Sequence, residues 1–349
     1  MMDRQDDVLL EIRNLRKSFH VANGLFARPL ELKALQDISF SIRKGETLGI
    51  VGESGCGKST LGRCILQLIP VDEGQVLWLG QDLTRVPAEE MRKRRQDLQI
   101  IFQDPLASLN PRMTVGEIIG DPLRALRPEL SRLERRKRVL RMMEAVGLLP
   151  EMINRYPHEF SGGQAQRIGI ARALVTEPKL IVCDEPVSAL DVSIQAQILN
   201  LLADLKDEFG LTLIFISHNL SVVRHVSDRI LVLYLGRIVE LAPGDQIYGD
   251  PQHPYTRALL TAVPVPDPKL ARQRSIDALR GEIPSPINQP SGCTFRTRCP
   301  HAVERCAEVV PPLEEVRPGH FAACIRWREL HLERGVAGEP EAAVAAATH

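Results

Sequence analysis

The stretch Gly52-Glu53-Ser54-Gly55-Cys56-Gly57-Lys58-Ser59 decides the fold, because it fits G-x-x-x-x-G-K-[ST], the pattern of a phosphate-binding loop. The apolar run Glu46–Val51 before it is typical of a short buried strand, and the run that begins at Thr60 reads as the start of a helix. Glycines let successive backbone N–H groups turn toward one anion, and a helix N-terminus adds partial positive charge. The pattern therefore predicts a strand–loop–helix unit in which the residues from Gly52 through Thr60 bind nucleotide phosphates. Lys58 would reach the terminal phosphates and Ser59 would ligate Mg²⁺.

The bulk composition is that of an ordinary globular chain. The 349 residues are 44% hydrophobic and 25% charged, with a formal net charge of zero. The zero net charge gives no sign of a nucleic-acid partner, and the basic runs 92–95 and 135–138 are interleaved with acidic residues, as on solvated helix faces. Residues 1–7 are polar and do not resemble a signal peptide, and the apolar runs are too short to span a bilayer. We expect a cytoplasmic protein that serves any membrane process by docking.

The pattern of apolar residues predicts an α/β protein with several parts. Ile38, Phe40 and Ile42 alternate with serines, as in a half-buried antiparallel strand. Strands are expected at 180–183, 211–216 and 229–235, the last followed by a hairpin turn at Gly236-Arg237. The expected parts are an antiparallel β-subdomain (1–45), a core with a mixed sheet (46–245) that contains a helical subdomain (about 105–170), a small accessory C-terminal domain (246–334) and a disordered tail (335–349).

A second apolar run, Leu180–Cys183, ends in two acids, Asp184 and Glu185. Nucleotide hydrolysis requires a metal ion and an oriented water in addition to a phosphate loop. Asp184, at the carboxyl end of its strand, would hold Mg²⁺ directly or through water. Glu185 would point toward the attacking water as general base. The pair predicts that the site hydrolyses the nucleotide.

The sequence contains a second candidate anion site at Ser161-Gly162-Gly163-Gln164, just before the helical run Arg167–Leu174. A serine and two glycines at a helix N-terminus present backbone N–H groups to an anion. One chain rarely needs two such sites for one nucleotide. We therefore expect each site to serve a different nucleotide across a dimer.

Six motifs in order resemble the ATP-binding subunits of ABC transporters. They are Gly52–Ser59, Gln103, Ser161–Gln164, Asp184-Glu185, Ser188–Asp191 and His218. The resemblance implies an ABC-type P-loop ATPase fold, with a mixed sheet core, an antiparallel β-subdomain and a helical subdomain. It also implies that two cassettes close head to tail around two ATP molecules.

The same resemblance implies roles for single residues. Ser161–Gln164 would reach the γ-phosphate that the partner's phosphate loop holds, and Asp191 would cross the dimer interface. Gln103 would sense Mg²⁺ and the attacking water, and His218 would contact the γ-phosphate. Phe19 stands where the family places an aromatic that stacks on adenine; since residues 20–34 resemble an insertion, a core position is the alternative for it.

Three further segments resemble the ATPases of dipeptide and oligopeptide importers, in particular the second of the two unlike ATPases of those systems: Gln103–Arg112, His253–Leu260 and Gly281–Pro286. The resemblance implies a peripheral motor subunit on the cytoplasmic side of the plasma membrane. Its partners would be a second homologous ATPase, two transmembrane permease subunits and, indirectly, a periplasmic or lipoprotein solute-binding protein. Related members import nickel or glutathione, so the solute stays open. A soluble ABC ATPase acting on DNA or ribosomes is a distant alternative, since the chain has one cassette and no sustained heptads.

Four of the seven cysteines gather in the proline-rich C-terminal part: Cys293, Cys299, Cys306 and Cys324. A cytosolic compartment disfavours disulfides, and four thiolates in a small loop-rich region suit Zn²⁺ or an iron–sulfur cluster. There is no C-x₂-C pair, so the spacing leaves iron–sulfur, zinc and no metal open. The family resemblance implies a [4Fe–4S] cluster. His301 and His320 are expected to be solvated loop residues, and Cys56, Cys64 and Cys183 to be packing residues.

Overall fold

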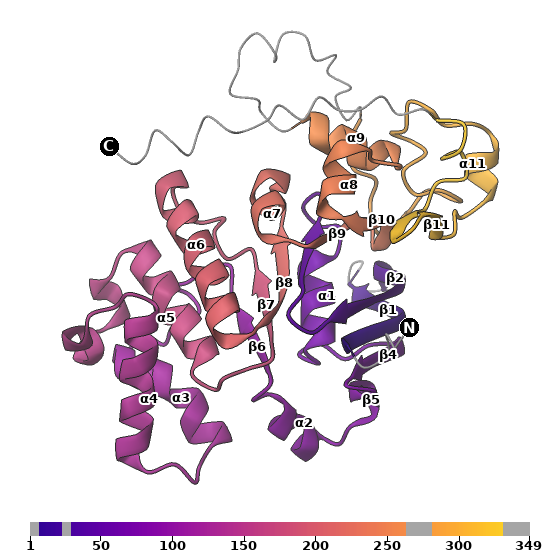
Figure 1. Ribbon diagram of the computed structural model, residues 1–349. Helices are drawn as coiled ribbons and strands as arrows, with labels where there is room; N and C mark the ends of the chain where they lie inside the picture. Colours follow the sequence, from indigo (N-terminus) through magenta and orange to yellow (C-terminus); the bar gives the residue numbers. More distant parts are fainter. Residues whose placement is uncertain (1–6, 23–28, 263–280, 331–349) are drawn as a thin grey trace.

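The computed structural model describes residues 7–22, 29–262 and 281–330, which fold around two β-sheets (Figure 1). The strands are β1 (Val8–Val21), β2 (Leu30–Arg43), β3 (Thr47–Val51), β4 (Glu73–Trp78), β5 (Gln81–Asp82), β6 (Leu98–Ile101), β7 (Leu180–Asp184), β8 (Thr212–Ser217), β9 (Arg229–Tyr234), β10 (Arg237–Pro243), β11 (Glu314–Arg317) and β12 (His320–Ala322). The larger sheet has the order β11-β12-β10-β9-β3-β8-β7-β6, and the smaller has the order β2-β1-β4-β5.

The centre of the larger sheet is parallel. β6, β7, β8, β3 and β9 pair in parallel, and every residue of β3, β7 and β8 is buried. Continuous apolar runs suit such strands because helices cover both of their faces. β10 and then β12 add antiparallel strands beyond β9, so the sheet is mixed, as predicted. The β9–β10 hairpin is confirmed, but its turn is at Leu235-Gly236, one residue before the predicted position, and φ is +43° and +76° there.

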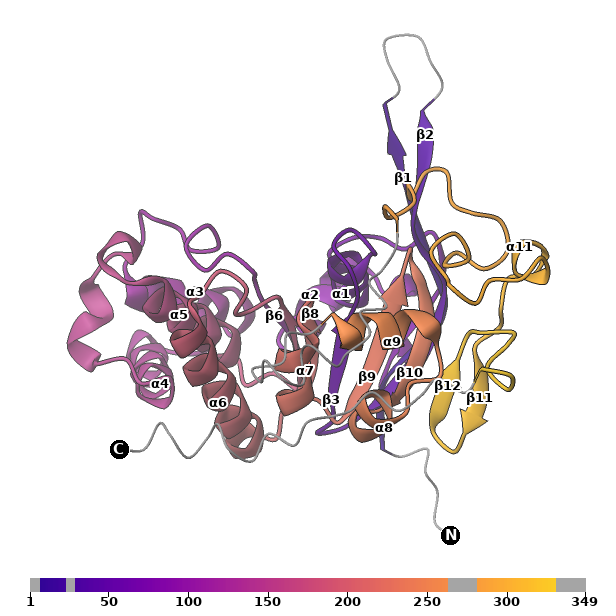
Figure 2. The same ribbon diagram turned by 90° about the horizontal axis from the view of Figure 1, so that it is seen from above.

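The smaller sheet is antiparallel, which confirms the prediction from the N-terminal alternation. Ile38, Phe40 and Ile42 are buried on one face of β2. β1 and β2 are each 14 residues long, and their far ends project beyond the rest of the molecule (Figure 2). The predictions for residues 1–6 and for the tail 335–349 fall outside the described residues.

The helices are α1 (Lys58–Ile65), α2 (Ala88–Arg94), α3 (Val115–Leu126), α4 (Arg132–Ala145), α5 (Gly162–Leu174), α6 (Val192–Phe209), α7 (Leu220–Val226), α8 (Gly244–Gly249), α9 (Pro254–Thr261) and α11 (Arg305–Glu308). α3, α4 and α5 pack into a lobe of their own, away from the smaller sheet in both views (Figures 1 and 2). Val139, Met142 and Met143 of α4 are buried there. Over the described ranges, no helix combines the length and apolarity needed to cross a bilayer.

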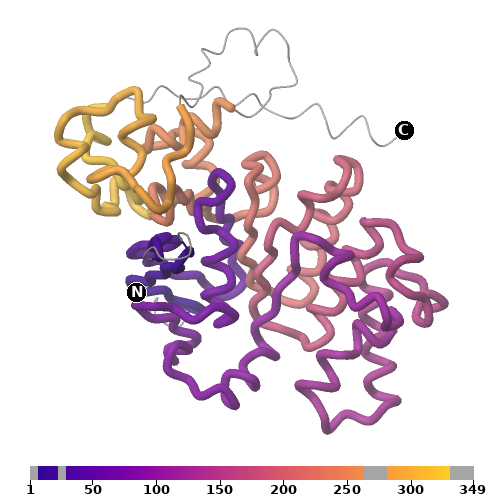
Figure 3. Tube along the Cα trace, turned by 180° about the vertical axis from the view of Figure 1, so that it is seen from behind, coloured from indigo at the N-terminus to yellow at the C-terminus, as the bar shows by residue number. Residues whose placement is uncertain are grey.

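The C-terminal segment, residues 281–330, lies beside the N-terminal strands although the two are far apart in sequence (Figure 3). β12 joins it to the larger sheet by pairing with β10. The expectation that His320 is a solvated loop residue is wrong. His320 begins β12, is fully buried, and its Nε2 lies 2.7 Å from Oε1 of the buried Glu240 of β10. Strand pairing carries the imidazole inward, where the Glu240 carboxylate provides its partner. His301 is partly exposed.

Candidate nucleotide site

The carboxyl ends of the parallel strands bring the predicted site residues to one edge of the sheet. β3 leads into the phosphate loop, β7 ends at Asp184 and β8 leads into His218. β6, the neighbour of β7, leads into Gln103. Ligands of open α/β sheets bind at this edge because loops from neighbouring strands meet there.

The phosphate loop can form only with glycine at two of its positions. At Gly52, where φ is +155°, a Cβ atom would lie 2.2 Å from the Leu233 carbonyl oxygen. At Gly57, where φ is +108°, it would lie 2.5 Å from the Ala34 carbonyl oxygen. The backbones of β9 and β2 thus leave no room for a side chain at these two positions of the loop. α1 begins directly after Gly57, so the helix N-terminus faces the loop.

Lys58 lies inside this loop. Its side chain is buried, and its Nζ donates hydrogen bonds to the carbonyl oxygens of Gly52, at 2.8 Å, and Glu53, at 3.0 Å. These bonds hold the ammonium group against the start of the loop. A positive charge at this place can bind a terminal phosphate.

Two oxygen-bearing side chains meet beside Lys58. The Ser59 hydroxyl donates a 2.6 Å hydrogen bond to Asp184, and Arg63 lies 3.8 Å from the same carboxylate. Burial raises the pKa of Asp184, while the Ser59 hydrogen bond and the charge of Arg63 oppose that rise. A hydroxyl and a carboxylate are ligands that Mg²⁺ prefers, so this donor set fits the metal.

Two residues that the sequence singles out for catalysis converge on one atom of a third, Glu185. The Gln103 amide donates to Oε2 of Glu185 at 3.3 Å, and Nδ1 of His218 lies 3.2 Å from the same oxygen. Glu185 has φ of +48°, an uncommon conformation for a residue with a side chain. Its backbone N–H donates to the Ile216 carbonyl oxygen at 3.0 Å, which helps to hold this turn in place. Strained backbone of this kind clusters at functional sites.

The second candidate anion site lies in the helical lobe. Ser161 caps α5: its hydroxyl accepts from the Gln164 N–H at 3.4 Å, and the Gln164 side chain accepts from the Ser161 N–H at 3.1 Å. Gly163 is packed so closely that a Cβ would lie 2.6 Å from Ile194. α5 and α1 lie apart in both views, so the fold does not bring Ser161–Gln164 to the phosphate loop of the same chain (Figures 1 and 2).

The other predicted residues take local positions. Asp191 caps α6 by accepting from the Ile194 N–H at 3.0 Å, and this bond holds the pKa of its carboxyl below the usual range. Thr60 is half-buried in the first turn of α1. Phe19 is half-buried on β1, with Lys17 Nζ 5.4 Å from the centre of its ring.

The four C-terminal cysteines line one small cavity of about 20 Å³. Burial raises the pKa of the Cys299 and Cys324 thiols to about 11, and that of Cys293 also rises. Within the residues that the structure describes, no group of three or more His, Cys, Asp or Glu side chains is arranged to hold a metal ion. The three cysteines expected to be packing residues, Cys56, Cys64 and Cys183, are buried in the core, as predicted.

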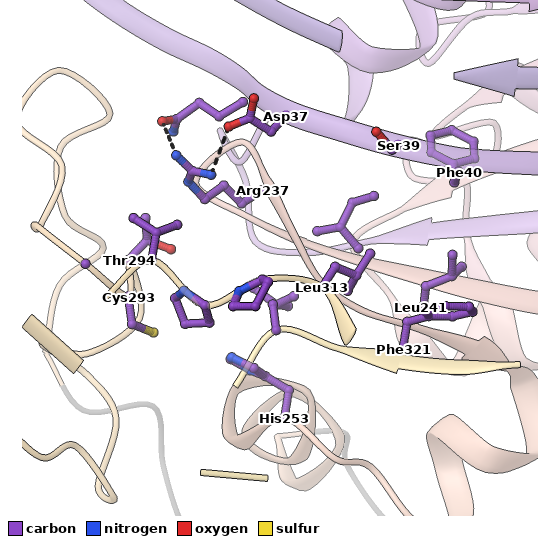
Figure 4. A pocket seen from close by; sticks show the side chains of 18 of the residues that line it. Asp37, Ser39, Phe40, Arg237, Leu241, His253, Cys293, Thr294, Leu313 and Phe321 are labelled. Carbon is purple, nitrogen blue, oxygen red and sulfur yellow. Dashed lines mark hydrogen bonds and ion pairs between the residues drawn. The ribbon is translucent and has the colours of Figure 1, made fainter. Parts of the chain in front are cut away.

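A larger pocket, of about 530 Å³, lies between the smaller sheet, β10 and the C-terminal segment (Figure 4). Arg237 crosses its upper rim, with hydrogen bonds or ion pairs to Gln36 and Asp37. The residues that line it do not include the phosphate loop, Asp184 or Glu185. This pocket is therefore separate from the candidate nucleotide site at the sheet edge.

Sequence reasoning missed three residues of the site. Arg63 approaches Asp184, and Tyr255 and Arg298 both contact Glu53 of the phosphate loop. The sequence pattern of a phosphate loop contains no signal for the last two, because they lie 202 and 245 residues from Glu53 along the chain.

Two family models match the chain. The one described as ABC transporter matches residues 35–188, and the one described as oligopeptide/dipeptide transporter, C-terminal region, matches residues 239–306.

Individual relatives match most of the chain. The oligopeptide transport ATP-binding protein OppF of Haemophilus influenzae is 58% identical over 323 residues, which cover 92% of this chain and 97% of the relative. OppF of Salmonella typhimurium is 60% identical over 313 residues, 89% of this chain and 94% of the relative. A solved dimeric ATP-binding cassette, in a post-hydrolysis state bound to ADP and Pi, is 32% identical with a TM-score of 0.60, covering 67% of this chain and 98% of that chain. The chain therefore belongs to the ABC transporter family, among its oligopeptide transport ATP-binding proteins.

Proposed function

We infer that this chain is the ATP-hydrolysing motor subunit of an oligopeptide importer. The observation that carries the hydrolytic role is the meeting of Gln103 and His218 at Glu185, beside a phosphate loop and the Ser59–Asp184 pair. The oligopeptide role rests on the relatives named OppF and on the match to the C-terminal region of such transporters. These relatives favour oligopeptides over nickel or glutathione as the solute.

The geometry supports a division of labour in hydrolysis. The loop of residues 52–60, which includes Lys58, binds the phosphates. Ser59 and Asp184 would supply oxygen ligands for Mg²⁺. Glu185 takes a proton from the attacking water, while Gln103 and His218 hold its carboxylate and the γ-phosphate in place. Glu185 has the uncommon backbone conformation, and its carboxylate contacts Gln103 and His218. Phe19 is the adenine-stacking candidate on β1.

The position of Ser161–Gln164 supports a head-to-tail dimer. These residues lie in the helical lobe, apart from the phosphate loop of their own chain, so a phosphate bound at this helix N-terminus would belong to another chain. We propose that a second, homologous ATPase supplies it and that Asp191 lies at that interface. The dimeric cassette to which this chain is similar shows that such folds associate.

The membrane partners are two transmembrane permease subunits, which dock on the cytoplasmic side of the plasma membrane near Gln103–Arg112. Arg172 anchors this segment by donating a 2.6 Å hydrogen bond to the Ser108 carbonyl oxygen. Since Gln103 begins the segment and also contacts Glu185, movement at the γ-phosphate is transmitted to the permeases. A solute-binding protein acts indirectly, and no nucleic acid takes part.

Glu185→Gln tests the hydrolytic role. The variant keeps the shape of the side chain but loses its basicity, so we expect hydrolysis to fall about 100-fold or more while ATP binding persists. Glu208→Gln, on an exposed part of α6, is the matched control and should hydrolyse at the original rate. Hydrolysis that is unchanged in Glu185→Gln would remove this residue from the role of general base.

We further propose that Cys293, Cys299, Cys306 and Cys324 hold a [4Fe–4S] cluster. Four thiols on one cavity are the donor set that such a cluster uses. The cavity of about 20 Å³ is near the size of one water, so the surrounding loops must move apart to admit a cluster. The cluster would crosslink a segment that has only short helices and strands.

Anaerobic purification tests this proposal. We expect about four iron atoms per chain and charge-transfer absorbance, both lost in Cys299→Ser. Cys64→Ser, which changes a buried thiol of the core, should keep the iron. Protein that contains zinc alone, or no metal, would contradict the cluster.

A further inference from the structure

Glu53, the second residue of the phosphate loop, contacts Lys58 of the same loop and two distant parts of the chain. Its backbone N–H donates a 3.0 Å hydrogen bond to the Tyr255 hydroxyl of α9. Its carbonyl oxygen accepts from Lys58 Nζ at 3.0 Å. Its carboxylate accepts two hydrogen bonds from the Arg298 guanidinium, at 2.6 and 3.0 Å. Glu53 therefore joins the C-terminal segment to the lysine that would bind the phosphates.

The pair of Arg298 and Glu53 belongs to the interior. Their side chains are 4% and 20% exposed, respectively. A guanidinium that donates two parallel bonds to one carboxylate fixes both the distance and the orientation of that carboxylate. These bonds also raise the pKa of Arg298. A buried, bidentate contact of this kind restrains the backbone of Glu53 much more than a surface ion pair would.

An aromatic cluster holds Arg298 and Tyr255 in place. Phe295 packs its ring 5.3 Å from the rings of both Tyr234 and Tyr255, and the two tyrosine rings are 4.6 Å apart. The Arg298 N–H donates to the Phe295 carbonyl oxygen at 3.0 Å, and its guanidinium lies 5.9 Å from the Tyr234 ring. The cluster thus links β9, α9 and the C-terminal segment behind the phosphate loop.

We propose that Arg298 is a positioning residue for ATP binding, through which the C-terminal segment holds the phosphate loop in its binding conformation. The proposal deepens the ATPase function above and rests on it. Without Arg298, the first turn of the loop would occupy the binding conformation for only a fraction of the time. The apparent dissociation constant of ATP rises by the inverse of that fraction.

The coupling must work in both directions. If the C-terminal segment favours ATP binding, bound ATP must stabilise the C-terminal segment by the same factor, because linkage between two binding free energies is reciprocal. Residues 289–299 carry Arg298 and are bounded by Gln289, which bonds to Gln36 of β2 at 2.6 Å. Amide exchange in this stretch is therefore a second readout, independent of hydrolysis.

Arg298→Ala in the full chain is the central test. We expect about a tenfold rise in the dissociation constant of a non-hydrolysable ATP analogue and in KM for ATP, with kcat changed less than about twofold, because saturating ATP orders the loop. Arg296→Ala is the matched control: it lies on the same loop, and its side chain bonds to Ser291 rather than to Glu53. Its ATP affinity should match that of the original chain. The analogue should slow amide exchange in residues 289–299 of the original chain and much less in Arg298→Ala.

A double mutant separates the contact from a general effect on folding. In a Glu53→Ala background, Arg298→Ala should change ATP affinity less than about twofold, because the partner is already gone. If Arg298→Ala does not fold, Arg298→Lys is the substitute. It keeps the positive charge but cannot donate two parallel hydrogen bonds, so it should weaken ATP binding by a few-fold. Unchanged affinity in Arg298→Ala or Arg298→Lys, or an equal loss in Arg296→Ala, would overturn the proposal. An original chain that fails to bind ATP would instead overturn the ATPase function itself.

Discussion

His253 is a fully buried histidine at the N-terminus of α9. Its Nδ1 accepts the Tyr255 N–H at 3.1 Å, so the cap uses a neutral imidazole. Burial lowers the pKa of His253 to about 3. The side chain therefore stays neutral in the folded chain over a range of pH in which an exposed histidine is charged.

This burial predicts that stability falls as the pH is lowered. Above about pH 6.5 the imidazole is neutral in both the folded and the unfolded chain. Below that pH only the unfolded chain takes up the proton, until the pH nears the folded pKa of about 3. His253→Asn keeps a capping acceptor and does not titrate. Urea denaturation measures the free energy of unfolding at pH 7 and at pH 5.5. Between these two pH values, the original chain should lose about 1 kcal/mol more of this free energy than the variant. Equal losses would contradict the assignment.

At the scale of elements, side-chain contacts hold β12 to β10 in addition to the backbone hydrogen bonds between the two strands. Glu240 of β10 is fully buried, and its carboxylate accepts the Gln252 N–H at 2.6 Å, the His253 N–H at 3.1 Å and a contact from His320 at 2.7 Å. A buried carboxylate is tolerated only when such partners satisfy it. The same group therefore joins β10, the start of α9 and β12.

His320→Ala should loosen this junction. The change removes one partner and leaves the Glu240 carboxylate buried, so we expect a loss of about 3 kcal/mol in the free energy of unfolding. His301→Ala, on a partly exposed histidine of the same segment, should cost less than about 1 kcal/mol. Chemical denaturation measures both. A cost for His320→Ala no greater than that for His301→Ala would show that Glu240 does not depend on this contact.

At the scale of the whole molecule, the two candidate anion sites lie in different lobes. The phosphate loop is at the centre of the larger sheet, and Ser161 is at the start of α5 in the helical lobe (Figure 1). In the head-to-tail dimer proposed above, each chain would contribute its phosphate loop to one composite site and Ser161–Gln164 to the other. That proposal ties hydrolysis to the association of two chains.

Ser161→Arg should separate ATP binding from hydrolysis. A bulky cation at the start of α5 blocks approach of the partner but lies far from the phosphate loop of its own chain. Titration should show unchanged ATP binding, while ATP-dependent association and hydrolysis are lost. Ser131→Arg is the matched control, because Ser131 caps α4 with the same capping box and both variants lose a cap worth about 1 kcal/mol. Normal hydrolysis in Ser161→Arg would exclude this surface from the composite site.

Much of the fold and of the candidate site was predictable from local pattern. The buried runs of β3, β7 and β8 and the alternation of β2 each follow from a period that neighbouring residues share. Glu185, Gln103 and His218 could be placed together because parallel strands end at one edge. His320 could not be placed, because its burial depends on β12 pairing with a strand some 80 residues earlier. Glu240 lies outside any local pattern around His320.

The sequence by itself determined the phosphate loop, the acids that follow β7 and the order of motifs that marks the family, because each is a short-range arrangement of residue types along the chain. Only the tertiary structure decided what surrounds them. The hydrogen bonds between Arg298 and Glu53 and the contact between His320 and Glu240 both join segments distant in sequence. Such contacts depend on how sheets and loops pack in three dimensions, where charge and burial are set by neighbours that no local window of sequence contains.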